Sequence, residues 1–154
     1  MPSLEEALAS HPFTRGFTSH QLRILAGCLE GETTWVPEAF LVSADGAADH
    51  CYLLVEGAAV ISADSPGRGR RSIQTIHAGD LLGWSWLFPP HRWAFDATAL
   101  TPTRAIVLDA ARLRAAIDDD PAFGLEVVRR VGATVADRLN ATRLQLLDLY
   151  GNRG

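Results

Sequence analysis

Between Thr33 and Asp109 the chain breaks into short apolar or alternating runs that are separated by Gly, Pro, Asp and Ser. Runs of this length that end at turn-forming residues are typical of β-strands. We expect strands at Thr34–Val36, Phe40–Ser43, Cys51–Val55, Ala58–Ser62, Arg71–Ile76, Ala94–Ala99 and Arg104–Leu108. Several short strands at close, regular spacing predict a sandwich or barrel.

Helical patterns lie on both sides of this strand-rich region. Ser3 opens a capping-box pattern and Thr18 precedes a second apolar-periodic run, so residues 3–27 are expected to form two short helices. After the strands, Asp109 is placed to cap a helix over residues 110–117. The predicted order is therefore helices, strands, helices.

The last helix is the longest predicted element. Asp120 and Pro121 form a start signal, and the only glycines between there and Tyr150 are Gly124 and Gly132. About 28 helical residues would span roughly 40 Å, more than one small barrel can cover. We therefore predict a parallel homodimer through an apolar stripe at three/four spacing, with packing on the chain's own barrel as the alternative. The predicted dimer interface is Val128, Val131, Val135, Leu139, Thr142, Leu146 and Leu149.

Length and composition set the class of protein. With 154 residues and 47% hydrophobic residues, the chain can form one compact domain with its own core. We expect a single domain, 1–154, made of a helical N-terminal part (1–30), a β-barrel (33–109) and C-terminal helices (110–150). The net charge of −4 disfavours nucleic acid as a direct partner. No stretch resembles a secretion signal or a membrane-spanning helix, so a cytoplasmic protein with no membrane contact is expected.

The reactive residue types form no catalytic or metal-binding pattern. Cys28 and Cys51 are not in a CxxC spacing, and we expect both to be reduced core thiols. The five histidines are scattered, with no His-x-His arrangement. No serine, histidine and aspartate set lies in a known motif, and the sequence predicts no enzyme, no metal site and no cofactor.

The most informative segment runs from Gly79 to Ala94. It places three of the four tryptophans beside a glycine turn and an arginine, Arg92. A glycine turn that leads into a short helix lets backbone N–H groups approach an anion, and an arginine offers the forked donors that a phosphate accepts. The same residues could also form a packed turn, since tryptophan is usually buried.

The order of all these elements carries a resemblance. The strand-rich core contains Tyr52-Leu53-Leu54-Val55-Glu56-Gly57 and Gly79-Asp80-Leu81-Leu82-Gly83. The chain resembles the cyclic nucleotide-binding domain of the CRP/FNR superfamily in the order of its elements, which are helices, this core and a long helix. The resemblance covers about Thr18 to Tyr150. It implies a mainly β fold with flanking helices, a double-stranded β-helix or jelly-roll barrel with a C-terminal dimerisation helix. It also implies a phosphate-binding cassette between a Gly-Glu pair and an Arg-Ser/Thr-Ala run.

Compared with that cassette, this chain keeps some positions and changes others. Gly83 occupies the glycine position, but Trp84 stands where the family has the glutamate that binds the ribose hydroxyl, and an indole cannot accept as a carboxylate does. Arg92-Trp93-Ala94 fits the Arg-x-Ala pattern. Counting back from the next strand instead places Trp93 in the arginine's position and moves Arg92 to the rim. The candidate ligand-binding residues are Gly83, Trp84, Ser85, Arg92, Trp93 and Ala94.

Two functions follow from the resemblance. The first is a stand-alone regulatory sensor that binds a cyclic nucleotide or related small anionic ligand and signals through its dimer helix. Here Arg92 and the backbone at Gly83 to Ser85 hold the phosphate, and Trp84 or Trp93 stacks the ligand. The second is a ligand-free barrel that acts as a dimeric protein-interaction module. Since no winged helix-turn-helix follows the long helix, we expect output through a protein partner or the dimer and not through DNA.

Overall fold

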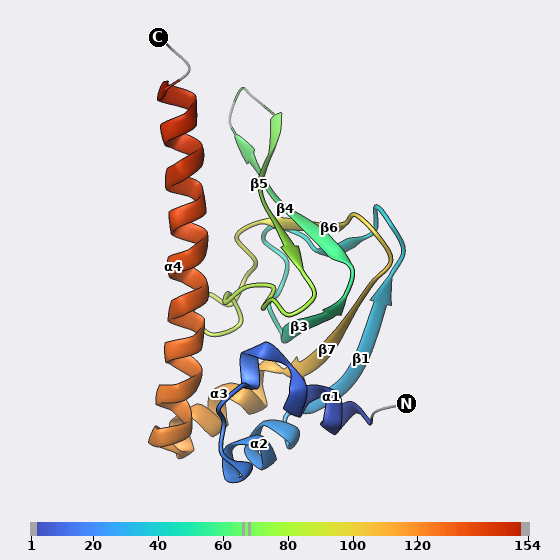
Figure 1. Ribbon diagram of the computed structural model, residues 1–154, viewed down its shortest axis with the longest axis vertical. Coiled ribbons are helices and arrows are strands. Elements are labelled where there is room, and N and C mark those ends of the chain that lie inside the picture. Colours follow the sequence, from blue (N-terminus) through green and yellow to red (C-terminus); the bar gives the residue numbers. More distant parts are fainter. Residues whose placement is uncertain (1–2, 66, 68, 152–154) are drawn as a thin grey trace.

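Two antiparallel sheets and a long helix form the body of the protein (Figure 1). The structure is a computed structural model that describes residues 3–65, 67 and 69–151. One sheet has the strand order β1-β7-β3 and the other β2-β6-β4-β5. The strands are β1 (Leu29–Trp35), β2 (Phe40–Val42), β3 (His50–Glu56), β4 (Ala58–Ser65), β5 (Gly69–His77), β6 (Asp96–Ala99) and β7 (Thr103–Asp109).

All seven predicted strands are present, and the mainly β fold with flanking helices is confirmed. Within the described residues the two sheets remain separate in their hydrogen bonding, as the two faces of a jelly roll, and do not close into one continuous barrel. The largest boundary error is β1, which begins at Leu29 and not at Thr34. Its alternation is weak in the sequence because Gly31 takes an inward-facing position and the register shifts between Leu29 and Gly31.

The helices begin where the capping residues predicted. They are α1 (Leu4–Ser10), the 3-10 turn η1 (Pro12–Thr14), α2 (Ser19–Ala26), α3 (Ala110–Asp119) and α4 (Pro121–Gly151). The Ser3 hydroxyl accepts from the Glu6 N–H at 3.1 Å, and Asp109 accepts from the Ala111 N–H at 3.2 Å. Thr18 makes a complete capping box with Gln21. These bonds satisfy N–H groups that a helix start leaves without partners.

Buried side chains from both sheets and the helices make one cluster. Trp86 and Phe123 are its largest fully buried members. Cys28 and Cys51 are free and buried, as predicted, and burial raises the pKa of both thiols. Neither thiol is therefore a ready nucleophile at neutral pH.

The turn between β3 and β4 depends on Gly57, the glycine of the Val-Glu-Gly motif. Its φ is 90°, in the left-handed region that favours glycine. A Cβ at this position would collide with the Pro102 carbonyl oxygen and the Thr103 backbone. The glycine lets the β3–β4 turn lie directly against the chain that enters β7.

Helix α4 stands beside the sheets and runs the full height of the molecule in Figure 1, with its upper part next to the β4–β5 hairpin. Its inner face buries Phe123, Val127 and Val131 in the core. Val131 is only 2% exposed, so its assignment to the dimer stripe was wrong. The three/four pattern contained residues of two different faces, and burial assigns Val131 to the inner one.

His11 fixes the N-terminal segment to β3. Its Nε2 lies 2.8 Å from the Leu54 carbonyl oxygen, and its Nδ1 accepts from the Phe13 N–H at 3.1 Å. Only the neutral ring with its proton on Nε2 can make both bonds. Burial lowers the pKa of His11 below its ordinary value of 6.5, opposed in part by the Leu54 bond and by Asp80.

Because the unfolded chain binds this proton first, we expect the free energy of unfolding to fall as the pH drops below about 6.5 and to level off below the folded-state pKa. Urea unfolding of wild type and His11→Gln between about pH 7 and pH 5 tests this. The variant should show a smaller pH dependence over that range. An unchanged slope in His11→Gln would assign the effect to other groups.

Candidate functional site

The loop between β5 and β6 carries all the predicted ligand-binding residues. It has no regular helix among its residues, so the short helix expected after the glycine turn is absent. Instead the Leu87 N–H donates to the Trp84 carbonyl at 2.9 Å, and the Trp86 indole donates to the Gly83 carbonyl at 2.8 Å. Trp86 is fully buried, so this loop is built around a tryptophan anchor.

Gly83 lies directly against aromatic rings. A Cβ on Gly83 would lie 2.9 Å from Phe95 Cζ and 3.2 Å from Trp93 Cζ3. The absence of a side chain at this position therefore lets the rings pack onto the backbone. The space beside the glycine is occupied by the protein's own side chains.

These rings belong to a row that crosses the interior. The centroids of Trp35 and Tyr52 are 5.7 Å apart, those of Tyr52 and Trp93 are 6.4 Å apart in a stacked arrangement, and those of Trp93 and Phe95 are 5.9 Å apart. Trp93 is only 4% exposed. The structure therefore places Trp93 in the core and not on an accessible wall.

Arg92 and Ala94, on either side of Trp93, are exposed. The Arg92 guanidinium donates to the Asp45 carbonyl at 2.8 Å, and the Trp93 N–H donates to the Gly46 carbonyl at 2.9 Å. The arginine is thus bound to the loop after β2, whereas Gly83 contacts the aromatic row. The sequence allowed two alignments with the family's cassette. The structure has the alignment in which Trp93 lies inside and Arg92 lies at the rim.

Trp84 and Ser85 are half-buried, and the Trp84 ring faces α4. The guanidinium carbon of Arg138, from α4, is 5.1 Å from the Trp84 ring centroid and 5.9 Å from that of Phe95. A cation over an aromatic face at this range is attracted by the ring. One Nη of Arg138 also donates to the Leu81 carbonyl.

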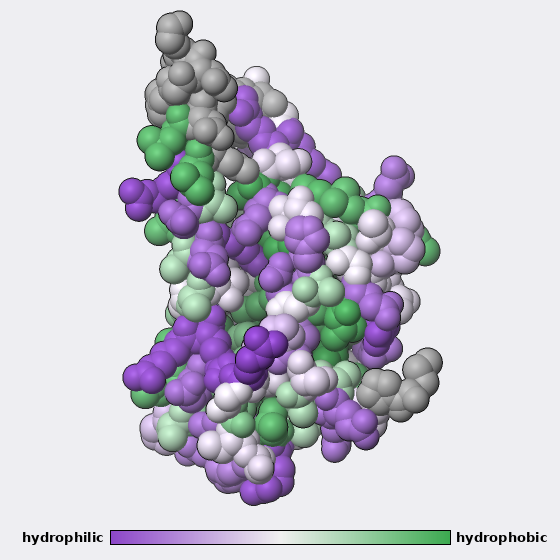
Figure 2. All heavy atoms as spheres, viewed as in Figure 1, coloured by the Kyte–Doolittle hydropathy of each residue, from purple (hydrophilic) through white to green (hydrophobic). Residues whose placement is uncertain are grey.

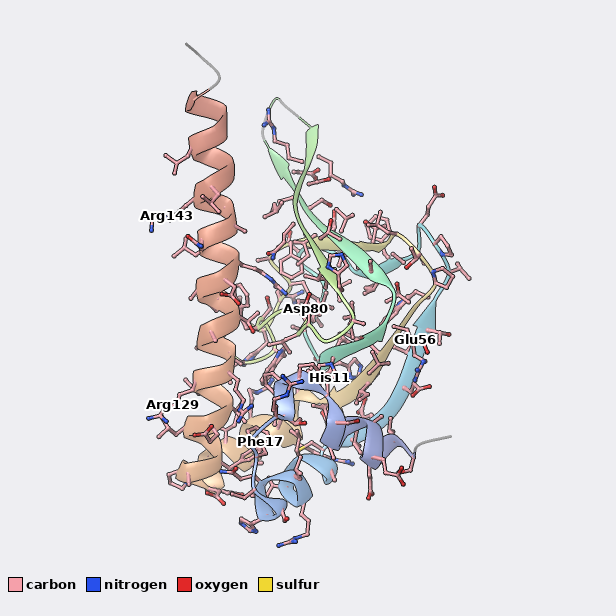
Figure 3. The ribbon with its side chains drawn as sticks, in the orientation of Figure 1. His11, Phe17, Glu56, Asp80, Arg129 and Arg143 are labelled. Atoms are coloured by element: carbon pink, nitrogen blue, oxygen red, sulfur yellow. The ribbon has the colours of Figure 1, made fainter. Side chains whose placement is uncertain are left out.

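Sequence reasoning did not identify Arg138. A signal was present, because position 138 lies seven residues after Val131 on the inner face of the helix, where an arginine interrupts an apolar series. Arg138 is only 8% exposed, and burial lowers its pKa to about 10, with Asp80 acting in the opposite direction. It therefore remains charged at neutral pH. Figure 3 shows Asp80 between α4 and the strands.

Two features of the described residues bear on other functions. Among them, no three His, Cys, Asp or Glu side chains are grouped so that they could hold a metal ion. No helix in the described part of the chain is long and apolar enough to cross a membrane.

Comparisons with known proteins agree with this architecture. The sequence model of the family "Cyclic nucleotide-binding domain" matches residues 32–120. A CRP-like cAMP-activated global transcriptional regulator of Mycobacterium tuberculosis is 31% identical over 115 residues, which are 73% of this chain and 49% of the regulator. The chain thus spans about half the length of the curated relatives that it matches.

Solved structures share the fold. A Geobacter metallireducens protein assigned to the cyclic nucleotide-binding proteins matches with a TM-score of 0.77 and 27% identity over 90% of this chain and 99% of that one. A cyclic nucleotide-binding domain from Methylobacillus flagellatus matches with a TM-score of 0.78 and 19% identity, over 94% of this chain and 81% of that one. From the match over most of its β region and from these likenesses, the chain belongs to the cyclic nucleotide-binding domain family, of the CRP/FNR type.

Proposed function

We propose that this chain is a regulatory sensor that binds a cyclic nucleotide or related small anionic ligand at the loop around Trp84 and signals through α4. The observation that carries the proposal is the stacking of Arg138 on Trp84. It joins the loop that binds ligand in this family to the helix that would transmit the signal. The Mycobacterium tuberculosis relative is a cAMP-activated transcriptional regulator, which supports a regulatory role. We propose a cytoplasmic location. We propose that the chain acts by binding and not by catalysis.

In this mechanism Arg138 and the ligand compete for one aromatic face. A base stacked on Trp84 takes the position of the guanidinium, and the phosphate lies near the backbone of Gly83 to Ser85. Arg138 then leaves Trp84, which changes how α4 packs on the loop. A ligand shifts such an equilibrium only by its difference in affinity for the two arrangements.

Calorimetry and tryptophan fluorescence with cAMP, cGMP and cyclic dinucleotides test the proposal. A responding nucleotide should release heat and change the tryptophan emission, and Trp84→Phe should reduce the fluorescence change. Arg92→Ala and Arg138→Ala identify the phosphate-binding cation. The first should weaken binding if Arg92 turns inward with ligand, and the second should strengthen binding if Arg138 is only a competitor. No heat and no thermal shift with any of these nucleotides would contradict the proposal.

A second function is favoured by the aromatic rings that cover Gly83. If Trp93 and Phe95 keep that space closed, the protein is a ligand-free interaction module that uses its surface and its helix. Under this alternative, none of the nucleotides changes the fluorescence, and both arginine variants behave as wild type toward them.

For either function we propose a homodimer formed through α4. Val128 and Leu139 are 45% and 59% exposed, and Val135 and Thr142 are half-buried. With Val131 in the core, Gly132 takes its place, so the stripe follows strict four/three spacing. A Cβ on Gly132 would contact nothing within 4 Å, which leaves room for a partner helix to approach. The side chains of Leu146 and Leu149 lie outside the described residues. In Figure 2 the part of α4 below the grey atoms carries both hydrophobic and hydrophilic side chains.

A further inference from the structure

A groove of about 280 Å³ lies between α4, β5 and the turn at residues 79–81, outside the aromatic row that fills the interior. Its walls include Gln74 from β5, Asp80 from the turn, and Arg130, Asp137 and Arg138 from α4. Pro12 and Phe13 of the N-terminal segment also line it. In Figure 3, Asp80 marks its position between the helix and the strands.

Three residues that line this groove each have a buried polar atom with no hydrogen-bond partner in the described part of the chain. They are Arg130 Nε, Arg138 Nη1 and Gln74 Oε1. Two are donors and one is an acceptor. Buried polar groups normally have partners, so three such atoms on residues that line one groove indicate a polar occupant that these side chains would turn to meet.

The charges in the groove indicate the sign of that occupant. Arg130 is close to a carboxylate, with its guanidinium 3.5 Å from Glu126. Arg138 has no carboxylate within ion-pair distance among the described residues, although it is more than nine-tenths buried. A buried charge normally has an opposite charge as partner. Asp80 and Asp137 line the groove too, but both are exposed, and Asp80 accepts from the His77 N–H at 2.8 Å.

We infer that this groove binds a small oxyanion, a phosphate- or carboxylate-bearing metabolite, with Arg138 Nη1 as its principal donor. Gln74 Oε1 accepts from a hydroxyl of the same ligand. Arg130 Nε offers a further donor on the side of Phe13. The site is separate from the nucleotide position proposed beside Gly83, and its existence does not depend on that proposal.

Occupation of the groove would act on the stacked arginine. An anion that binds Nη1 holds the same guanidinium that lies over Trp84 and donates to Leu81. The oxyanion therefore stabilises the packing of α4 on the loop. A nucleotide that needs Arg138 to leave Trp84 would oppose it, and the two ligands would weaken each other's binding.

Inorganic phosphate is the probe, titrated by calorimetry and thermal shift at constant ionic strength in the absence of nucleotide. We expect phosphate to bind and to raise the melting temperature. Sulfate should bind more weakly, because hydrogen phosphate has an O–H for Gln74 Oε1 and sulfate has none. Phosphate that neither binds nor stabilises the wild-type protein would overturn the inference, whatever the nucleotides do.

The variants locate the site. Arg138→Gln should weaken phosphate binding roughly tenfold or more, since it removes one charge-assisted bond. Arg129→Gln is the matched control, because Arg129 lies on the same helix and its side chain is 67% exposed. Figure 3 shows Arg129 pointing away from the sheets. If both variants weaken binding equally, the effect is one of net charge and the proposed site is wrong.

A third variant keeps the test valid if Arg138→Gln does not fold. Asp137→Asn removes a negative charge from the edge of the groove without touching the three unpartnered atoms. We expect it to bind phosphate more tightly than wild type. Unchanged or weaker binding in Asp137→Asn would place the phosphate elsewhere.

Discussion

Replacing Trp86 with alanine is expected to lower the free energy of unfolding by about 3–5 kcal/mol. Trp86 is the largest fully buried side chain, and the change leaves a cavity where the loop between β5 and β6 meets the core. Two bonds depend on its position. The Trp86 indole donates to the Gly83 carbonyl, and the Arg114 guanidinium of α3 donates to the Trp86 carbonyl at 2.7 Å.

Trp86→Phe is the matched control, because it keeps most of the ring volume and removes the indole N–H. We expect it to cost less than the alanine change and to report mainly the bond to Gly83. Urea unfolding followed by far-UV circular dichroism, at one protein concentration, measures both variants without relying on tryptophan emission. A loss below about 1 kcal/mol for Trp86→Ala would mean that the loop is not anchored by this residue.

Replacing Leu139 with aspartate is expected to weaken the proposed dimer roughly 100-fold or more. Burial of one leucine between two helices contributes about 1.5–3 kcal/mol to the free energy of association. A homodimer contains the leucine in both chains, so the substitution removes this contribution twice. The new carboxylate would also face its counterpart across the interface. Leu139 is 59% exposed in the single chain, so its change should leave the fold of that chain intact.

Leu144→Asp is the control for this experiment. Leu144 is on the same helix and similarly exposed, at 56%, but it lies outside the four/three stripe. Sedimentation velocity at micromolar concentration should show a dimer for wild type and Leu144→Asp and a monomer for Leu139→Asp. A wild-type monomer would contradict the dimer, and equal loss in both variants would contradict the assigned face.

The elements of the fold were predictable because their signals are local. Ser3, Thr18 and Asp109 cap helices through bonds to residues two or three positions away. The strands have apolar runs bounded by turn residues. The start of β1 was missed because Leu29 to Thr33 takes its regularity from pairing with β7, which the segment does not encode by itself.

The site was less predictable because its contacts are distant in sequence. The rings of Trp93 and Phe95 lie on Gly83 only after the loop folds back. The sequence therefore allowed either Arg92 or Trp93 in the family's arginine position and could not choose between them. Arg138 is 54 residues from Trp84 along the chain. The inner and outer faces of α4 are likewise separated only by what packs on them, which is why Val131 was given to the wrong face.

Helix α4 has two stripes with different repeats. The inner residues Phe123, Val127, Val131 and Arg138 follow steps of four, four and seven, close to the 3.6-residue turn of a straight helix. The outer stripe from Val128 to Thr142 repeats every seven residues, and a strict heptad drifts by about 20° per repeat unless the helix supercoils. A coiled coil that extends up α4 must therefore wind the helix about its partner. The pitch of that winding would set the angle at which each Arg138 meets its own Trp84.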